Sequence, residues 1–516
     1  MQIGKIFKNI KQAYKKQTFT TLAFDSKKCI KGCIFFAIKG KKFNGNNFIN
    51  DAIAKGAKTI ISDRKFEGFK KEILYLYAKN TRLSLSEAAT NFYKIRPKNL
   101  LAVTGTNGKS SIANFYYQIL KLNNKVSSSI GTLGINFKSL ILKTNNTTLD
   151  PITLNKTLFK LKKLKIDNVI LEASSHGLDQ NRLYGLKFDV GIFSNFSRDH
   201  LDYHKSYKNY LNSKLILFKD LLKKRGQIIF DNDIPEAKII KNIIKKYKYK
   251  YLCIGKKSDL IIIRHQYLKD YQKIDFTFKK KAYSFKTKLI GKIQLKNLFM
   301  AILAASKYVK IDKIVKSLNK IKSLNGRFEN IGKLKNNSKV ILDYSHTPDA
   351  LKACISNIKD QFKTSKISIV FGCGGERDKP KREIMGKVAS ELCDTVYLTD
   401  DNPRSENPKK IRTQVKKKID SRKLIEIASR RKTIQTAIEN LLSGEILIVA
   451  GKGHENYQEY KSKKLFSDRI YINKYIKSKN RRLSYFWKTN IINENLPIKK
   501  INFNKKILTV STNSKT

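Results

Sequence analysis

Short apolar runs alternate with polar loops and helix-like patterns over most of the chain. Between residues 20 and 95 the apolar runs are Cys33–Ile38, Thr59–Ser62 and Ile73–Leu76. Runs of this length are typical of buried strands, and the stretches between them are typical of the connections in α/β folds. The pattern therefore predicts an α/β domain at the N-terminal end, followed by a linker at Pro97–Asn99.

The same rhythm continues from residue 98 to about residue 328. A run that begins at Leu101 is followed by runs at Val169–Glu172, Val190–Phe193 and Gln227–Phe230. Strands that alternate with helices favour a mostly parallel sheet with helices on both faces. We therefore expect a first domain over residues 1–97 and a central domain over residues 98–328.

A further α/β series begins near Lys339. Its apolar runs are Val340–Asp343, Ile367–Phe371, Thr395–Leu398 and Ile446–Val449. Each run ends in a polar loop, which is where open α/β sheets place their ligands. A third domain is expected over residues 329–480. The rhythm stops after about residue 480, so residues 481–516 are expected to form a tail.

The composition changes this picture little. With 516 residues and 41% hydrophobic content, the chain has enough apolar side chains for several folded domains. The formal net charge is +66, but the lysines are spread over nearly every segment. We therefore expect no specific nucleic-acid partner, and non-specific attraction to polyanions stays as the alternative.

The sequence gives no sign of a membrane-bound or secreted protein. No stretch approaches the roughly 20 apolar residues of a membrane span. Residues Met1–Asn9 lack the apolar segment of a signal peptide. The six cysteines are scattered along the chain, which favours reduced thiols. We expect a soluble cytoplasmic protein that acts as a monomer.

The segment Leu101–Ser110 carries the most specific chemistry. An apolar run leads into Gly-Thr-Asn-Gly-Lys-Ser, and a helical pattern follows. In such an arrangement the loop N–H groups and the helix start hold phosphate oxygens, the lysine reaches the terminal phosphates and the hydroxyl binds Mg²⁺. Val103 stands where the usual pattern has its first glycine, so a glycine-rich turn without a ligand is the alternative. The pair Lys109 and Ser110 favours ATP binding.

Two polar loops with acidic residues and histidines follow neighbouring apolar runs. Glu172 ends one run and is followed by Ala173–Arg182, while the next run is followed by Asn195–His204. Mg²⁺ prefers one or two carboxylates together with phosphate oxygens. Either loop alone is compatible with a solvated turn. Together with the phosphate loop they favour metal-assisted phosphoryl chemistry.

A set of motifs now gives a specific resemblance. The motifs are Gly105–Ser111, Glu172–Arg182, Asp199–His204, Gly326–Glu329, Asp343–Asp349, Phe371–Asp378, Asp401–Arg404 and Gly451–Glu455. In this order they resemble the Mur ligase family of peptidoglycan synthesis, over roughly residues 20–475. The resemblance implies an α/β protein of three domains. A UDP-substrate-binding domain would precede a central P-loop ATPase-like domain with a mostly parallel sheet, and a Rossmann-like, amino-acid-binding domain would follow.

The resemblance also implies a reaction. ATP would phosphorylate the γ-carboxylate of the D-glutamate in UDP-N-acetylmuramoyl-L-alanyl-D-glutamate, and the amine of an incoming amino acid would displace phosphate from the acyl phosphate. The expected amino acid is meso-2,6-diaminopimelate, because Asp401–Arg404 resembles the family's diaminopimelate signature. Arg404 could hold, with two parallel hydrogen bonds, the carboxylate that L-lysine lacks.

Site residues follow from the resemblance by position. For ATP it implies Gly105, Thr106, Asn107, Gly108, Lys109, Ser110, Ser111, Asn297, Arg327, Asp343 and His346. For two Mg²⁺ ions it implies Ser110, Glu172, His200 and Lys214, the last as a carbamate formed with CO₂. The implied catalytic residues are Lys109, Glu172, His200 and Lys214.

The same comparison of positions implies the substrate contacts. For the UDP-muramoyl-dipeptide these are Ser26, Asn146, Thr147, Thr148, Ser174, Gln180 and Arg182. For diaminopimelate they are Arg377, Asp401, Asn402, Pro403, Arg404, Gly451 and Glu455.

The tail has a resemblance of its own. Thr509–Lys515 is similar to Thr21–Lys27 near the start of the chain. The segment from Trp487 onward resembles the opening of another Mur ligase first domain. A tail of this length is too short to form that domain alone, so we expect activity without residues 481–516.

Other functions stay open at this point. A lysine-adding relative is disfavoured by Arg404. Folylpolyglutamate synthetase shares the phosphate loop, but it would not explain Asp401–Arg404 and Gly451–Glu455 together. A basic nucleic-acid-binding protein would leave the polar motifs at the strand ends unexplained.

Overall fold

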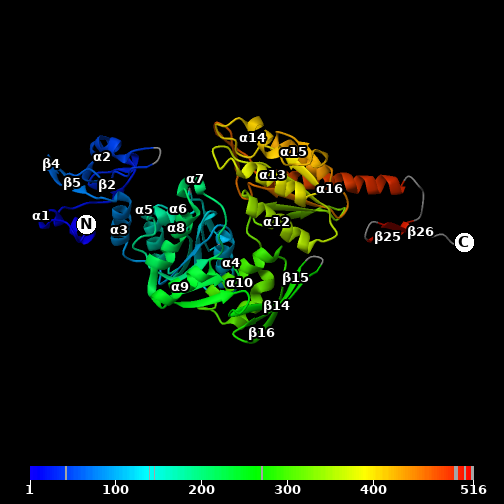
Figure 1. Ribbon diagram of the computed structural model, residues 1–516, viewed down its shortest axis with the longest axis horizontal. Coiled ribbons are helices and arrows are strands. Elements are labelled where there is room, and N and C mark those ends of the chain that lie inside the picture. Colours follow the sequence, from blue (N-terminus) through cyan, green and yellow to red (C-terminus); the bar gives the residue numbers. More distant parts are fainter. Residues whose placement is uncertain are drawn as a thin grey trace.

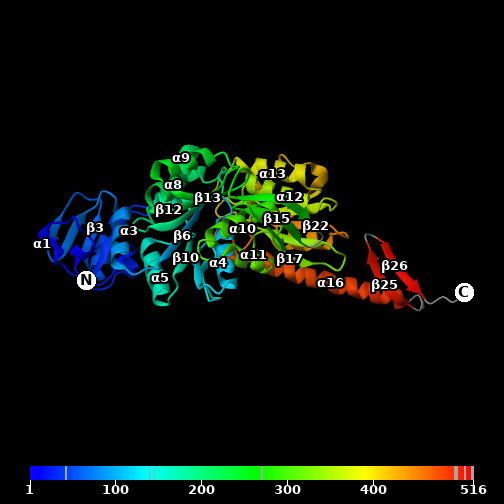
Figure 2. The ribbon, with the colours of Figure 1, turned by 90° about the horizontal axis from the view of Figure 1, so that it is seen from below.

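Three large sheets, each with helices packed against it, follow one another along the described part of the molecule (Figure 1). The computed structural model describes residues 1–40, 43–138, 140–144, 146–268, 271–492, 498–504 and 507–512, with side chains as far as Leu483. Figures 1 and 2 both place the central domain between the other two. The arrangement confirms the expected α/β class, with a parallel-dominated sheet in each of the three parts. The exact domain bounds stay predictions.

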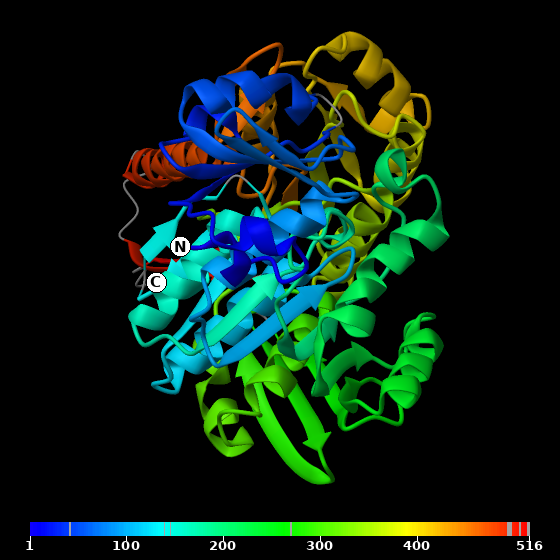
Figure 3. The same cartoon turned by 90° about the vertical axis from the view of Figure 1, so that its left-hand side faces the viewer.

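The first domain is a five-stranded sheet in the order β1-β2-β3-β5-β4, and β4 alone in it runs antiparallel to its neighbour. Its elements are η1 (Ile3–Lys5), α1 (Gln12–Lys15), β1 (Leu22–Ala23), η2 (Ser26–Lys28), β2 (Cys33–Phe36), η3 (Gly45–Phe48), α2 (Ile49–Ala54), β3 (Ala57–Ser62), β4 (Gly68–Lys70), β5 (Ile73–Tyr77) and α3 (Thr81–Phe92). Figure 3 looks onto this sheet from the N-terminal side of the molecule. Helix α3 ties the domain to the next one, because Ser86 Oγ donates to the Asn181 carbonyl at 2.7 Å.

The central domain holds the phosphate loop between an interior strand of its sheet, β6, and a largely buried helix, α4. Its strands are β6 (Asn99–Thr104), β7 (Ser127–Gly131), β8 (Gly134–Phe137), β9 (Leu140–Leu142), β10 (Asn168–Glu172), β11 (Phe188–Phe193), β12 (Leu222–Asp231), β13 (Lys250–Ile254), β14 (Leu260–Tyr267), β15 (Gln272–Phe278) and β16 (Lys281–Thr287). Its helices are α4 (Lys109–Leu122), α5 (Pro151–Lys163), α6 (Ser175–Asp179), α7 (Leu201–His204), α8 (Tyr207–Asp220), α9 (Ala237–Tyr247), α10 (Lys292–Ala305), α11 (Ile311–Ser317) and η4 (Leu318–Lys320).

The alternation of side chains along β6 builds two cores. Leu101 and Val103 pack with α4 and α10 on one face of the sheet, whereas Leu100 and Ala102 pack with α5, α8 and α9 on the other. Successive strand residues point to opposite faces, and both faces of a parallel sheet are covered by helices. Strand β6 is therefore buried on both sides, which fixes the position of the loop that follows it.

The central sheet has antiparallel edges that the βαβ pattern did not indicate. Its order is β16-β15-β14-β13-β12-β11-β6-β10-β7-β8-β9. The middle strands are parallel, but β14-β15-β16 and β7-β8-β9 are antiparallel meanders. Strand β15 alternates buried and half-buried positions, which is the pattern of a strand with one solvated face.

The C-terminal domain is a six-stranded sheet in the order β17-β18-β22-β19-β20-β21, parallel except at β17. Its strands are β17 (Glu329–Lys333), β18 (Lys339–Asp343), β19 (Ile367–Phe371), β20 (Thr395–Leu398), β21 (Leu424–Glu426) and β22 (Ile446–Ala450), with the small pair β23 (Tyr457–Glu459) and β24 (Lys463–Leu465) beside it. Its helices are α12 (Pro348–Gln361), α13 (Lys381–Leu392), α14 (Pro408–Lys416), η5 (Ser421–Lys423), α15 (Arg430–Glu439) and α16 (Asp468–Ile492).

Helix α16 crosses the boundary expected at residue 480 without a break. Beyond it lie β25 (Ile498–Asn504) and β26 (Ile507–Thr512), which pair with each other and lie beyond the C-terminal domain in Figures 1 and 2. The resemblance of Thr509–Lys515 to Thr21–Lys27 falls partly outside the described residues. No helix in the described part of the chain combines the length and apolar content needed to cross a membrane.

Candidate functional site

The phosphate loop connects β6 to α4, and hydrogen bonds with the loop after β11 determine its conformation. Gly108 has φ +86°, a value that L side chains rarely adopt, and a side chain there would meet the Asn297 amide. The Asn107 N–H donates to Asn195 Oδ1 at 2.9 Å, and Ser194 Oγ donates to the Asn107 carbonyl at 2.5 Å. These two contacts come from the loop after β11, so the neighbouring strand sets the shape of the phosphate loop.

Two lysines converge on this loop, of which Lys214 is buried and Lys109 is half-buried. Lys109 Nζ donates to the carbonyls of Gly105 (2.9 Å) and Thr106 (2.8 Å), and Lys214 Nζ donates to the same Gly105 carbonyl at 2.8 Å. Burial and the nearby Lys109 charge hold the pKa of Lys214 well below its usual value, and burial also lowers the pKa of Lys109. Burial of an ammonium disfavours its charged form. Burial therefore disfavours the charged form of the Lys214 side chain relative to that of an exposed lysine.

Glu172 at the end of β10 faces the first turn of α4. Its carboxylate accepts from Ser110 Oγ at 2.8 Å, from the Thr132 N–H at 3.0 Å and from Thr132 Oγ1 at 3.1 Å. A buried carboxylate beside a serine hydroxyl at a phosphate loop is a donor set that suits Mg²⁺. In the described part of the chain no three His, Cys, Asp or Glu side chains group into a metal site. Ser110 and Glu172 would suit an ion that also takes phosphate oxygens as ligands.

His200 stands at the other side of the loop, before α7. Its Nε2 lies 3.4 Å from Asp199 Oδ2, and its ring lies edge-on to that of His176, with 4.8 Å between centroids. Burial is the main cause that lowers the pKa of His200, and likewise that of His176, to about 4. Both imidazoles are therefore neutral near pH 7, which is the form that binds metal ions.

One cavity of about 240 Å³ joins the central and C-terminal domains. The expected site residues that line it are Thr106, Asn107, Gly108, Lys109, Ser110, Ser111, Thr147, Glu172, Ser174, His200, Asn297, Arg327, Asp343 and His346. Arg327 lies over the ring of Tyr344, with 4.2 Å from the guanidinium carbon to the ring centroid. The cavity thus brings together nearly all the residues expected around ATP, from both domains.

The residues expected around the muramoyl-dipeptide divide into three places. Thr148 Oγ1 lies 3.0 Å from Ser174 Oγ, and its carbonyl accepts from Arg182 Nη1 at 2.7 Å. Arg182 Nη2 donates to Gln180 Oε1 at 2.8 Å, and Thr147 and Ser174 line the cavity. Asn146 is exposed, and Ser26 is buried in η2 of the first domain, away from the cavity.

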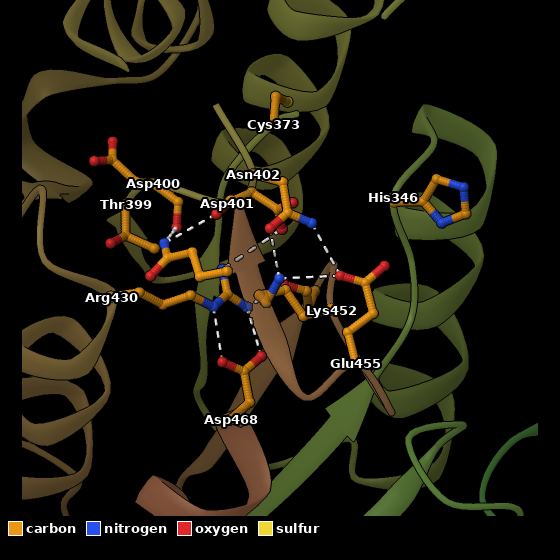
Figure 4. A network of polar contacts seen from close by, with 12 residues as sticks. His346, Cys373, Thr399, Asp400, Asp401, Asn402, Arg430, Lys452, Glu455 and Asp468 are labelled. Atoms are coloured by element: carbon orange, nitrogen blue, oxygen red, sulfur yellow. Dashed lines mark hydrogen bonds and ion pairs between the residues drawn. The ribbon is translucent and has the colours of Figure 1, made fainter. Parts of the chain in front are cut away.

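Three of the residues expected around diaminopimelate, Asp401, Asn402 and Glu455, lie together in the loops after β20 and β22 (Figure 4). Asn402 Nδ2 donates to Glu455 Oε2 at 2.9 Å. Arg404 Nη1 donates to the Gly375 carbonyl at 2.7 Å, and Arg404 Nε lies 3.4 Å from Glu459 Oε2. Of the remaining members, Gly451 adjoins the Asp401 carboxylate, the Pro403 carbonyl adjoins Gly375, and Arg377 is exposed.

Sequence reasoning missed several side chains that hold this cluster together. Arg382 is fully buried and binds both oxygens of Glu406, at 2.8 and 2.7 Å, which is the main cause that lowers the pKa of Glu406 to about 2. Arg430 binds both oxygens of Asp468 at 2.8 and 2.7 Å, with both side chains fully buried. Lysines and arginines are so frequent in this chain that their residue type alone gave no signal.

Comparison with known proteins covers most of the chain. A model described as "Mur ligase family, catalytic domain" matches residues 18–93. The model described as "Mur ligase middle domain" matches residues 103–305, and "Mur ligase, glutamate ligase domain" matches residues 326–453. The three matches follow the order of the three sheets.

Individual relatives agree with these models. A protein of Rickettsia rickettsii named UDP-N-acetylmuramoyl-L-alanyl-D-glutamate–2,6-diaminopimelate ligase is 41% identical over 477 residues, which are 91% of this chain and 98% of the relative. A solved structure of a ligase with that name is 28% identical with a TM-score of 0.68, covering 93% of this chain and 99% of the other. Folylpolyglutamate synthase of Mycobacterium tuberculosis, at 14% identity with a TM-score of 0.60, covers 72% of this chain and 92% of its own, and shows a shared fold alone.

Proposed function

The chain belongs to the Mur ligase family of ATP-dependent ligases, and we propose that it joins meso-2,6-diaminopimelate to the D-glutamate of UDP-N-acetylmuramoyl-L-alanyl-D-glutamate, converting ATP to ADP and phosphate. The relatives named for this reaction support the choice of substrates. The observation that carries the proposal is the shared cavity, which is lined by the phosphate loop, Glu172 and Arg327 and by Tyr344 of the C-terminal domain.

The first step is the transfer of a phosphoryl group. A γ-carboxylate oxygen of the D-glutamate attacks the terminal phosphorus of ATP, the bond to ADP breaks, and an acyl phosphate forms. The loop N–H groups and the N-terminus of α4 bind the phosphate oxygens. Lys109 Nζ, which rests on the Gly105 and Thr106 carbonyls, turns to those oxygens and offsets their charge.

We propose that two Mg²⁺ ions bind beside the phosphate loop. Ser110 and Glu172 would hold one of them, and His200 would help to hold the second. When bound, Mg²⁺ neutralises charge that develops on the phosphates. We propose that Lys214 reacts with CO₂ through its neutral amine, forming an N–C bond and releasing a proton. The resulting carbamate would give the site a further anionic ligand, which an ammonium cannot provide.

The second step selects and joins the amino acid. The amine of diaminopimelate attacks the acyl carbon, and the tetrahedral intermediate expels phosphate and releases a proton. Glu455 and Asn402 would bind the head of the amino acid, and Arg404 would bind its distal carboxylate with charge-assisted hydrogen bonds. Ser26 would hold the uridine end of the other substrate from the first domain. We propose that the enzyme works as a monomer in the cytoplasm, where its nucleotide substrates are made.

Mass spectrometry of the product tests this function. With ATP, Mg²⁺, UDP-N-acetylmuramoyl-L-alanyl-D-glutamate and meso-diaminopimelate, the nucleotide-linked product should gain the mass of one diaminopimelate minus water. Formation of ADP should depend on both other substrates. If ADP forms at the same rate without them, or no product of that mass appears, the proposal is wrong.

A further inference from the structure

Lys452 lies beneath the amino-acid residues just described, in the loop after β22 (Figure 4). Its side chain is fully buried. A buried ammonium is costly unless it is paired and hydrogen-bonded. The neighbours Gly451 and Glu455 match the family's amino-acid contacts, but Lys452 itself was not among the residues expected from the sequence. The groups that bind the Lys452 ammonium should therefore account for its burial at this position.

The ammonium of Lys452 binds two side chains of the expected diaminopimelate site. Its Nζ lies 2.9 Å from Asn402 Oδ1 and 3.0 Å from Glu455 Oε2. Asn402 Oδ1 also accepts from the Glu459 N–H at 2.9 Å. Because Asn402 Oδ1 accepts from two donors, the orientation of the amide is determined, and its Nδ2 faces Glu455. Lys452 thereby sets the orientation of both side chains.

Backbone geometry brings Lys452 to this position. Gly451 has φ +107°, and a side chain on it would meet the carboxylate of Asp401. The loop after β22 can therefore run directly against the loop after β20, with the lysine side chain beneath both. Within that contact the Lys452 ammonium forms an ion pair with the Glu455 carboxylate at 3.0 Å.

Glu455 connects this network to the cavity. The hydroxyl of Tyr344 donates to Glu455 Oε1 at 3.3 Å, and Tyr344 lines the 240 Å³ cavity. The oxygen that Lys452 does not bind is thus directed toward the place where the acyl phosphate would form. A shift of Glu455 or a flip of the Asn402 amide would misplace the incoming amine.

We propose that Lys452 is a positioning residue for the amino-acid substrate, holding Asn402 and Glu455 in the orientation that receives the α-amino end of diaminopimelate. The proposal rests on the function proposed above. The new element is the role of Lys452. This residue is proposed to control the affinity for diaminopimelate, but not the affinity for ATP or the UDP-muramoyl-dipeptide, without contacting any substrate itself.

Lys479 provides a matched control in the same domain. It too is a buried lysine, and its ammonium donates to the carbonyls of Ile438, Glu439 and Leu441 at 2.9, 2.9 and 2.6 Å. These carbonyls follow or end α15, away from Asn402 and Glu455. Replacing either lysine by methionine removes a buried ammonium at similar side-chain volume. Only the replacement of Lys452 disturbs the proposed amino-acid site.

The experiment compares full-length wild type, Lys452→Met and Lys479→Met by steady-state kinetics and thermal unfolding. We expect Lys452→Met to raise KM for diaminopimelate about tenfold or more, as for the loss of hydrogen bonds to a charged group, while KM for ATP stays near the wild-type value. Lys479→Met should lower the unfolding temperature and leave both KM values near those of wild type. Lys452→Gln, which keeps a donor, should fall between wild type and Lys452→Met.

Several results would overturn the inference. One is an unchanged KM for diaminopimelate in Lys452→Met, and another is a parallel rise of both KM values. A third is failure of both Lys452 variants to fold while Lys479→Met folds, since Lys452 would then be a general structural residue. An inactive wild type would instead contradict the proposed function, so the two failures are distinguishable.

Discussion

At the scale of single residues, the proposed reaction depends on charged side chains that hydrogen bonds to neighbouring groups hold in one orientation. Three donors orient the two oxygens of Glu172, the residue proposed to bind Mg²⁺. The backbone of Arg404, the residue proposed to bind the distal carboxylate, has φ +56° and donates a hydrogen bond to the Glu459 carbonyl at 2.9 Å. Such preorganisation is what allows a few polar groups to discriminate between similar substrates.

Arg404 offers the first prediction. Replacing Arg404 by methionine removes the guanidinium proposed to bind the distal carboxylate of diaminopimelate. KM for diaminopimelate should rise roughly 10- to 100-fold, as expected for the loss of charge-assisted hydrogen bonds, with KM for ATP nearly unchanged. Steady-state kinetics with each substrate varied in turn would measure this. An unaltered KM for diaminopimelate would remove Arg404 from the site.

His454 gives a prediction about pH. Burial, followed by the charges of Arg327 and His346, lowers the pKa of His454 from 6.5 to about 3. The unfolded chain therefore binds a proton between these pH values that the folded chain does not, so stability falls as pH drops below about 6.5. The His454→Gln variant should lose roughly 2 kcal/mol less than wild type between pH 7 and pH 5. Urea unfolding at the two pH values measures the difference, and equal losses would contradict it.

At the scale of elements, one buried ion pair joins two segments of the C-terminal domain. Arg430 begins α15 and Asp468 begins α16, and their side chains are fully buried against each other. Breaking a buried pair by removing one partner leaves an uncompensated charge, which typically costs about 3–5 kcal/mol. The Asp468→Asn variant should therefore unfold far more readily than wild type in urea.

A surface pair provides the comparison for this prediction. Lys387 and Glu391 lie 3.7 Å apart on α13, with both side chains more than half exposed. The Glu391→Gln variant should change stability little, since exposed pairs contribute little. A similarly small effect of Asp468→Asn would show that the Arg430–Asp468 pair does not join α15 to α16.

The elements also show what sequence patterns can and cannot predict. The phosphate loop and Glu172 were predictable because each motif is local and directly follows an apolar run. The contact between Asn402 and Lys452 was not, because it joins loops fifty positions apart and depends on the strand order β20-β19-β22. The meander β14-β15-β16 was missed although β15 carries a two-residue alternation, since the βαβ rhythm around it suggested more parallel strands.

At the scale of the whole molecule, the tail is separate from the site. Helix α16 is anchored by Ile472, Tyr475 and Ile476 in the core and by the Lys479 ammonium, all before residue 481. Figures 1 and 2 place β25 and β26 at the far end of the molecule from the first domain. Deletion of residues 481–516 should leave turnover close to that of the full chain. A tenfold or larger loss of activity in a folded deletion variant would contradict this prediction.

The central claim is that this ligase selects diaminopimelate. The most direct measurement is phosphate release from ATP and Mg²⁺ with UDP-N-acetylmuramoyl-L-alanyl-D-glutamate, offering meso-diaminopimelate or L-lysine in parallel at equal concentration. Release with diaminopimelate and none above background with L-lysine is the predicted result. Release with L-lysine would keep the ligase and overturn the proposed substrate. No release with either amino acid would contradict the account as a whole.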